Sequence, residues 1–465
     1  MPQPNILMLI TDQQRWDAMS CVSDWLETPN MDRIASEGVR FSNCVTNSPV
    51  CVPARLSLAT GHYAHNTGVW NNLHHTLSPD CPNWMRVVRN AGYRTSLFGK
   101  THYYPQDKDL RDYEEMLHAY GLDDVDEIGG PNASKKCLSH MTAMWQEKGV
   151  WETYKVDHTD RKKTKPWVAR PSPLSLECYM DVYVGQQAKT YLEAYGRDQP
   201  WFCTVSFGGP HAPWDAPEPY HSRYNPDDMP DPIPNPGIDR ERPNGLLDAK
   251  EQIPFEPGEE KLIRANYAGN VTLIDDQIGE IFDAIEKRGE MDNTVIVFMS
   301  DHGEMNGDYG FTSKGNMLNG AVRVPLLIRT PETVKSDVAG SVCDSPIEWF
   351  DVGPTLVELA GGEIDYTQFA KSACPVLKDP AKEHRTEAIS EYTGEIMLLN
   401  REWKIVLNQE GQPYMLFNVE DDPLEVNNLA GLPEMKEVED RLRLRILERV
   451  ASAQVQSGAH FVLGA

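Results

Sequence analysis

The 465-residue sequence contains no CxxC pair, although it has nine cysteines. An odd number of widely spaced cysteines argues against a disulfide framework and predicts reduced thiols. No apolar run approaches the roughly 18 residues that mark a membrane-spanning helix, so no membrane span is expected. Nothing resembles a signal peptide, because the first apolar stretch, residues 5–11, is short and leads straight into polar residues. These absences together predict a cytoplasmic protein.

Positive charge is also scarce. Only 44 basic residues stand against 70 acidic ones, giving a formal net charge of −26. This balance argues against nucleic-acid binding and against binding to anionic membranes. An anionic small molecule would therefore need a locally basic pocket. The length and the 40% hydrophobic content are typical of a large globular α/β domain with a smaller one attached.

Short apolar runs alternate with segments of helical period through the first three quarters of the chain, which indicates an α/β fold. The longest predicted helix has apolar residues at spacings of three and four from Ile263 to Ile285. The predicted strands cover residues 6–10, 39–45, 95–98, 201–207, 294–300 and 324–328. The predicted helices cover a segment ending at Gly38 and residues 51–60, 84–91, 179–195, 259–289 and 350–360.

Two regions are predicted to lack regular structure. Residues 105–175 mix charge runs with aromatic residues, and we interpret them as insertions and loops near a site. Ten prolines lie between Pro217 and Pro257, which argues against a helix or strand there.

A domain boundary is predicted within residues 361–383, which divides the chain into residues 1–370 and 371–465. Beyond it, short apolar segments at 388–390, 403–407 and 414–418 precede a helix at 433–451. This pattern predicts a small antiparallel sheet with a helix packed on it, an α+β subdomain.

Polar residues follow directly on four of the predicted strands. They begin at Asp12, Lys100, His211 and Asp301. In an open parallel sheet, ligands bind at the carboxyl ends of the strands. We therefore expect these four clusters to meet at one edge of the sheet.

The segment around Cys51 predicts a helix whose N-terminus carries that cysteine. Pro53 is favoured in a first helical turn, and Gly61 is a plausible C-cap. Free N–H groups at such an end favour an anion, and Arg55 would add a cation one turn later. From these residues alone, a buried cysteine beside a helix start is the commoner explanation.

The motif Cys-x-Pro-x-Arg from Cys51 to Arg55, continued by Leu58, Thr60 and Gly61, resembles the signature of the type I sulfatases. These enzymes belong to the alkaline phosphatase superfamily. Ala54 stands where the family often has Ser. The resemblance implies that a formylglycine-generating enzyme oxidises Cys51 to formylglycine (3-oxoalanine), whose hydrated aldehyde is the nucleophile.

The resemblance also implies the fold. We expect an alkaline-phosphatase-like α/β architecture, in which helices enclose a large mixed, mostly parallel sheet and a small C-terminal α+β subdomain follows. The run Leu416–Ala430 resembles a segment of that subdomain in sulfatases.

Asp12, Gln13, Asp301 and His302 form an oxygen-rich set with one imidazole, which suits a hard divalent cation. Taken alone, Asp-His-Gly after a strand is more often a turn. The resemblance implies one divalent ion held by these residues and by the side chain at position 51. Ca²⁺ is the expected ion, with Mn²⁺ or Mg²⁺ as alternatives, because Gln13 replaces the commoner Asp.

The resemblance assigns roles to four cationic or proton-donating residues, although a single Lys after a strand is usually just a solvated end. It implies that Lys100 and Lys314 hold the sulfuryl oxygens and that His102 contacts the nucleophile. It further implies that His211 or Lys314 protonates the leaving alcohol, a task to which a near-neutral His is suited. Residues 70–75 and 214–215 lie beyond two of these segments, where a sugar or aryl subsite and simple loop packing are both open.

The expected function is hydrolysis of an organic sulfate monoester, with a carbohydrate or aryl alcohol and a small-molecule or oligosaccharide substrate. The main alternative is a phosphonate monoester hydrolase or phosphodiesterase with the same formylglycine site, since related enzymes of that kind carry Asp-Gln and Asp-His at these positions. A non-enzymatic binder of sulfated glycans and a phosphomutase are weaker alternatives. A phosphomutase would normally use Ser or Thr in place of Cys51.

Overall fold

An eight-stranded sheet forms the centre of the computed structural model, which describes residues 3–73, 75–161, 163, 165, 167–235, 254–454 and 461. The strand order is β5-β4-β6-β1-β7-β8-β2-β9, and every neighbouring pair is parallel except the two that involve β8. The strands are β1 (Asn5–Thr11), β2 (Val39–Phe41), β4 (Arg94–Gly99), β5 (Asp124–Glu127), β6 (Trp201–Ser206), β7 (Thr294–Ser300), β8 (Leu326–Arg329) and β9 (Ser341–Cys343). This confirms the expected mixed, mostly parallel sheet.

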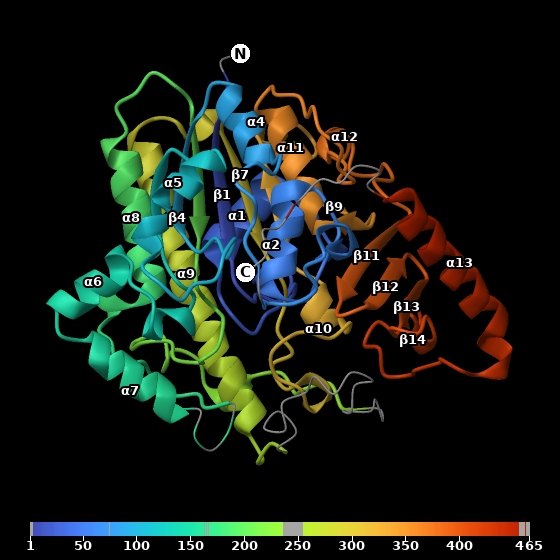
Figure 1. Ribbon diagram of the computed structural model, residues 1–465. Coiled ribbons are helices and arrows are strands. Elements are labelled where there is room, and N and C mark those ends of the chain that lie inside the picture. Colours follow the sequence, from blue (N-terminus) through green and yellow to red (C-terminus); the bar gives the residue numbers. More distant parts are fainter. Residues whose placement is uncertain are drawn as a thin grey trace.

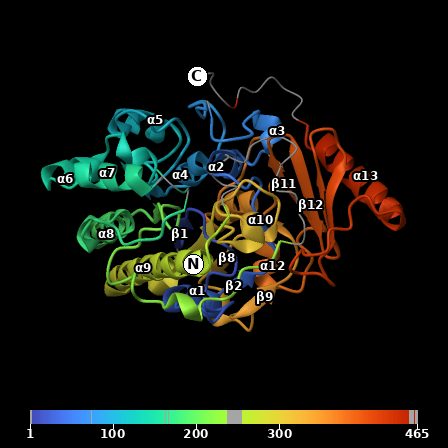
Figure 2. The same cartoon turned by 90° about the horizontal axis from the view of Figure 1, so that it is seen from below.

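Helices cover both faces of this sheet, as Figures 1 and 2 show. Alternate residues of β1 point to opposite faces: Leu7 and Leu9 pack in one core cluster, and Ile6 and Met8 in the other. The first cluster includes α1 (Pro29–Glu37), α8 (Met180–Ala194) and α9 (Glu259–Lys287). The second includes α2 (Cys51–Thr60), α4 (Trp84–Asn90) and α11 (Val352–Leu359). Strands buried on both faces read as continuous apolar runs, which is why β1, β6 and β7 were predictable.

Helix α2 begins at Cys51, as its sequence predicts. All ten of its residues are buried, and Gly61 closes it with φ 73°, donating its N–H to Ser57 O. A left-handed conformation at this position favours glycine, because a side chain there is strained. The nucleophile candidate therefore stands in the first turn of a helix enclosed by protein.

The C-terminal part contains a four-stranded antiparallel sheet and a long helix, and this confirms the predicted α+β subdomain. The sheet is formed by β11 (Glu387–Tyr392), β12 (Glu395–Asn400), β13 (Trp403–Leu407) and β14 (Pro413–Asn418). One face packs against α13 (Lys436–Ser452), through Ile405 and Leu442 among others. The domain boundary at residue 370 stays a prediction.

The prediction that residues 105–175 are loops was wrong. They contain α5 (Glu114–Ala119), β5, α6 (His140–Glu147) and α7 (Trp151–Arg161). The buried stripe of α7 consists of Trp151, Tyr154, His158 and Arg161. Because His158 and Arg161 are polar, the segment has helical spacing without the apolar pattern that would reveal it.

Residues 39–45 were predicted as one strand but form two, β2 and β3 (Cys44–Val45). β3 pairs with β10 (Ile347–Glu348) in a separate small sheet. The predicted Pro-rich loop lies partly outside the described residues, at 236–253, and its described part from 217 to 235 holds only a three-residue 3-10 turn, Pro226–Asp228. The short helices α3 (Ala64–Thr67), α10 (Asn319–Val322) and α12 (Cys374–Lys378) complete the set used below.

All nine cysteines are free, as predicted. Within the described ranges, no helix is both long enough and apolar enough to cross a membrane.

Candidate active site

The carboxyl ends of four neighbouring parallel strands bring the predicted clusters together. β4, β6, β1 and β7 are adjacent in the sheet, and Lys100, His211, Asp12 and Asp301 follow them along the chain. Asp12 and Asp301, like Cys51 on α2, are buried. The predicted convergence at one edge of the sheet is what the structure shows.

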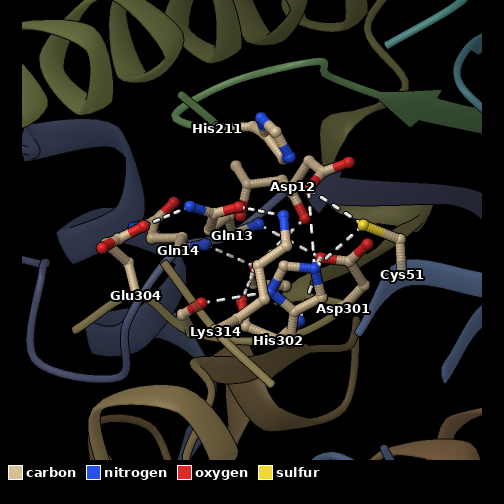
Figure 3. A network of polar contacts seen from close by, with 12 residues as sticks. Asp12, Gln13, Gln14, Cys51, His211, Asp301, His302, Glu304 and Lys314 are labelled. Atoms are coloured by element: carbon tan, nitrogen blue, oxygen red, sulfur yellow. Dashed lines mark hydrogen bonds and ion pairs between the residues drawn. The ribbon is translucent and has the colours of Figure 1, made fainter. Parts of the chain in front are cut away.

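Four side chains meet at the centre of this edge. Ligand atoms of Asp12, Cys51, Asp301 and His302 all lie within 4.8 Å of one another (Figure 3). His302 Nε2 is 3.0 Å from Cys51 Sγ, 3.7 Å from Asp12 Oδ1 and 3.6 Å from Asp301 Oδ1. One nitrogen, one sulfur and two carboxylate oxygens thus face a common point.

The second oxygen of each carboxylate contacts a cation. Lys100 Nζ donates to Asp12 Oδ2, and Arg55 Nε donates to Asp301 Oδ2 at 2.8 Å. Arg55 Nη1 is held by Lys100 O at 2.8 Å and by Ser206 Oγ at 3.0 Å. Buried carboxylates need such counter-charges. The pairing leaves both Oδ1 atoms directed at the common point.

The orientation of His302 favours a ligand role. Its Nδ1 lies 3.1 Å from Gly303 O, so a proton on Nδ1 would be donated to that carbonyl and the lone pair would remain on Nε2. Carboxylate oxygens with one imidazole nitrogen suit a divalent cation. The residues therefore fit the metal that the sequence resemblance implies, as far as Asp12, Asp301, His302 and position 51 are concerned.

Gln13 lies beside this cluster, with its side chain turned away from it. Its Nε2 donates to Glu304 Oε2, and its Oε1 accepts from Lys314 Nζ (Figure 3). Its backbone N donates to Asp301 Oδ1 at 3.1 Å, and its φ is 73°, in the left-handed region. Gln13 thus links the carboxylate of Asp301 to Lys314 across the rim of the cluster.

Two further residues at the site were given no catalytic or metal-binding role by the sequence interpretation. Glu304 is fully buried, and its Oε1 accepts N–H groups of Asn306 at 3.0 Å and Ser313 at 2.6 Å. Asn72, considered only as a possible subsite residue, accepts the N–H of Val52 at 3.0 Å. The signal for Glu304 was its place in the run Asp-His-Gly-Glu, but its partners depend on tertiary contacts. His74, also in the considered subsite, lies outside the described residues.

The electrostatic environment of the site is set by its cations. Burial and Asp12 raise the pKa of the Cys51 thiol, but Lys100, Lys314 and His302 outweigh them and bring it below its ordinary value. Burial, together with Lys314, holds the pKa of His211 well below its ordinary value. Burial and Lys100 do the same to the pKa of His102. Both imidazoles are therefore neutral at pH 7, which differs from the near-neutral pKa expected for a proton-donating His211.

The two imidazoles occupy different places around the cluster. His211 lies over Asp12, on the side away from His302 (Figure 3), and its Nδ1 is 2.5 Å from Ala212 O. His102 has φ 63°, and its buried Nδ1 has no hydrogen-bond partner within the described residues. Trp214 and Asp215, the second segment considered for a subsite, are both buried.

Comparison with known families gives two matches that together span almost the whole chain. The Sulfatase family matches residues 4–362. The family described as N-sulphoglucosamine sulphohydrolase, C-terminal, matches residues 307–452.

Individual relatives match over nearly their full lengths. An arylsulfatase of Clostridium perfringens is 28% identical over 478 residues, covering 96% of this chain and 94% of that protein. A multifunctional alkaline phosphatase superfamily protein of Trinickia caryophylli is also 28% identical, covering 93% and 92%. The crystal structure of a phosphonate monoester hydrolase of Agrobacterium radiobacter superposes with a TM-score of 0.80 at 24% identity, covering 99% of each chain. At that identity, the structural likeness shows a shared fold.

Proposed function

Because this chain belongs to the sulfatase family, whose members hydrolyse sulfate esters, we propose that it cleaves an organic sulfate monoester with a carbohydrate or aryl alcohol. The observation that carries the proposal is the meeting of Cys51, Asp12, Asp301 and His302 within 4.8 Å, inside a ring of cations. The overall charge of −26 makes this basic ring the place for an anionic ester.

The sulfate group is held by the cations that surround position 51. Lys100 and Arg55 are fixed by the two aspartates, and Lys314 is held by Gln13. Arg55 Nη2 is buried, has no hydrogen-bond partner within the described residues and lies 3.6 Å from Asp12 Oδ2. Fixed cations in a buried site stabilise the charge that develops on the transferred group at little reorganisation cost.

A divalent ion belongs to this proposal, with Asp12, Asp301, His302 and the side chain at position 51 as its ligands. When bound, such an ion lowers the pKa of a coordinated hydroxyl and neutralises charge on the transferred group. Ca²⁺ is the ion proposed, with Mn²⁺ or Mg²⁺ as alternatives. Gln13 is not among these ligands in its observed conformation, because its amide pairs with Glu304 and Lys314.

The nucleophile is proposed to arise by conversion of Cys51 to formylglycine, carried out by a formylglycine-generating enzyme. The hydrated aldehyde supplies one hydroxyl that displaces the alcohol and a second whose loss of a proton regenerates the aldehyde and releases sulfate. The side chain at position 51 lies 3.0 Å from His302 Nε2 and 3.7 Å from Asp12 Oδ1, so it would share the ion with these two ligands.

The leaving alcohol is proposed to take its proton from Lys314 or from His211. In the free site His211 is neutral because of burial and Lys314, so Lys314 is the proposed donor. An arriving sulfate anion would raise the pKa of His211, which then provides a second route.

One observation favours the second candidate, a phosphonate monoester hydrolase or phosphodiesterase. Gln13 leaves the site with one carboxylate fewer than an Asp would give, and its amide is already paired with Lys314. This makes the site more positive, so singly charged phosphorus diesters are expected as secondary substrates.

A comparison of rates distinguishes the two functions. We expect kcat/KM for an aryl sulfate to exceed the values for a matched aryl phosphonate monoester and an aryl phosphodiester with the same leaving group. A preference for either phosphorus ester by more than tenfold, about 1.4 kcal/mol in the barrier, would overturn the assignment in favour of the second candidate.

A further inference from the structure

The loop that carries Lys314 is built onto the C-terminal sheet. Met305, Tyr309, Met317 and Leu318 from this loop share a core cluster with residues of the sheet, including Ala388 of β11, Met397 of β12, Val406 of β13 and Phe417 of β14. We call residues 305–322 the Lys314 loop. The apolar side chains of the loop are buried against the sheet. The position of Lys314 therefore depends on the position of the sheet.

The backbone of the loop is in contact on two sides immediately after Lys314. Gly315 donates its N–H to Pro49 O at 2.9 Å, two residues before Cys51. On its other side a Cβ at Gly315, whose φ is 77°, would lie 3.3 Å from the ring of Tyr392 in β11. The backbone at Gly315 is therefore closely packed between the segment that precedes Cys51 and the C-terminal sheet.

The far end of the loop is fixed by a buried ion pair of the C-terminal part. Glu425 Oε2 accepts the N–H of Asn319 at 2.8 Å, and Glu425 Oε1 accepts from Lys404 Nζ. Lys404 Nζ also donates to Asn319 Oδ1 at 2.9 Å. The side chains of both members of the pair are fully buried. Lys404 and Glu425 together hold the first residue of α10, five positions after Lys314.

Backbone strain concentrates at the site, in the loop and at its two contacts with the sheet. Among the described residues, seven other than glycine have positive φ: Gln13, His102, Asn306, Tyr309, Ser313, Thr393 and Glu425. The first two are site residues, the next three lie in or beside the Lys314 loop, and Thr393 and Glu425 belong to the C-terminal part. Such conformations are unfavourable and persist only where the surroundings impose them.

A buried Lys–Glu pair is a poor source of stability, because desolvation offsets much of its attraction. The presence of the Lys404–Glu425 pair is explained if it fixes the position of Asn319 and of the Lys314 loop. A further contact points the same way: Tyr309 OH donates to Leu424 O at 2.6 Å, in the residue next to Glu425. Both contacts come from the run Leu416–Ala430, to which no role has so far been attached.

We propose that Glu425, fixed by Lys404, is a positioning residue that sets Lys314 against the nucleophile from the C-terminal sheet. The C-terminal part thereby completes the active site without touching the substrate. What Lys314 does to the substrate rests on the proposed function, but the coupling between Glu425 and Lys314 does not.

The test is a double-mutant cycle between positions 425 and 314. Glu425→Asp keeps the charge opposite Lys404, so the fold is retained, but it shortens the side chain by one methylene and withdraws it from the N–H of Asn319. We expect a tenfold to hundredfold fall in kcat in the wild-type background and less than a twofold fall in the Lys314→Ala background. Glu425→Gln combined with Lys404→Met, which is neutral and keeps the acceptor, is expected to retain more activity than Glu425→Asp.

A matched control is Glu439→Gln, at another buried acid of the same part. Glu439 accepts the N–H of Gly431 at 2.7 Å and is not one of the residues that hold Asn319. It is expected to leave kcat within twofold. Equal falls in both backgrounds, or no fall with Glu425→Asp, would overturn the proposal. The cycle uses whichever ester the wild type hydrolyses fastest, so a preference for phosphorus esters would contradict the proposed function and leave the cycle valid.

Discussion

Two buried clusters of charged residues in this protein are similar in composition but differ in how fully their polar atoms are hydrogen-bonded. The active-site cluster contains Asp12, Arg55, Lys100, Asp301 and His302. The second, which we call the bracing cluster, contains Tyr63, Glu348, Asp351, Arg385 and Arg449 and joins α3, the β10 region, β11 and α13.

In the bracing cluster every carboxylate oxygen has a donor. Glu348 accepts from Tyr63 OH at 2.6 Å, from Arg449 Nη2 at 2.7 Å and from Ile389 N at 2.9 Å. Asp351 accepts from Arg385 Nε at 2.7 Å, and its other oxygen accepts from Lys371 N at 2.7 Å. In the active-site cluster, by contrast, Arg55 Nη2 has no hydrogen-bond partner within the described residues, and three ligand atoms face one another around His302 Nε2.

The bracing cluster therefore stabilises the fold, whereas the active-site cluster has polar groups that remain free to bind a ligand. A saturated buried network contributes rigidity, and removing one member leaves its partners unpaired. An unsaturated network is held together by the fold at the expense of stability and gains its missing partners on binding.

The largest expected effect is that of Asp301→Ala. This change removes a proposed metal ligand and the partner of Arg55, so activity should fall by at least about 10³-fold, roughly 4 kcal/mol in the barrier. Elemental analysis should find about one divalent ion per wild-type chain and none in the variant. A fully active, metal-free wild-type preparation would contradict this account.

Asp351→Asn should lower the stability of the fold and leave the activity unchanged. It leaves Arg385 facing a neutral group in a buried place, so the free energy of unfolding should fall by about 3–5 kcal/mol. The kcat per folded molecule should not change, because the bracing cluster does not touch the substrate. Urea unfolding together with active-site counting measures both quantities. Unchanged stability together with a reduced kcat would contradict the structural role assigned to the bracing cluster.

The bracing cluster should also give the protein a specific sensitivity to acid. Burial raises the pKa of Asp351, but Arg385 and His384 lower it further, to about 2. A carboxyl with a lowered folded pKa stabilises the protein above its unfolded pKa, near 4, and this stabilisation disappears as the pH falls towards 2. The difference in unfolding free energy between wild type and Asp351→Asn should therefore shrink by about 1–2 kcal/mol between about pH 4.5 and about pH 2.5. A difference that stays constant over this window would contradict the prediction.

The smallest expected effect concerns substrate preference. Gln13→Asp places a carboxylate beside Glu304 and breaks the link to Lys314. The ratio of kcat/KM for aryl sulfate to that for phosphodiester should rise severalfold, or both values should fall. Glu304→Gln in the same chain should relieve part of the change, because the two carboxylates no longer repel each other. A shift towards the phosphodiester would show that Gln13 does not set the preference.

The sequence was sufficient for those parts of the molecule that depend on local order. β1, β6 and β7 are apolar runs buried on both faces, and the residues after them were expected at one edge of a sheet. It was insufficient where a residue's role depends on distant partners. Glu304 binds Gln13 from 291 positions away, and Lys100 pairs with Asp12 from 88 positions away. α7 escaped detection because its buried stripe is aromatic and charged.

The most direct test of the central claim is the chemical state of position 51 in active enzyme. Preparations with different extents of conversion should be digested, and the peptide containing position 51 weighed by mass spectrometry, while kcat is measured on the same samples. Activity is expected to rise in proportion to the fraction that carries aldehyde or its hydrate, and Cys51→Ala should be folded and inactive. Full activity in a sample that contains only the unmodified thiol would contradict the account.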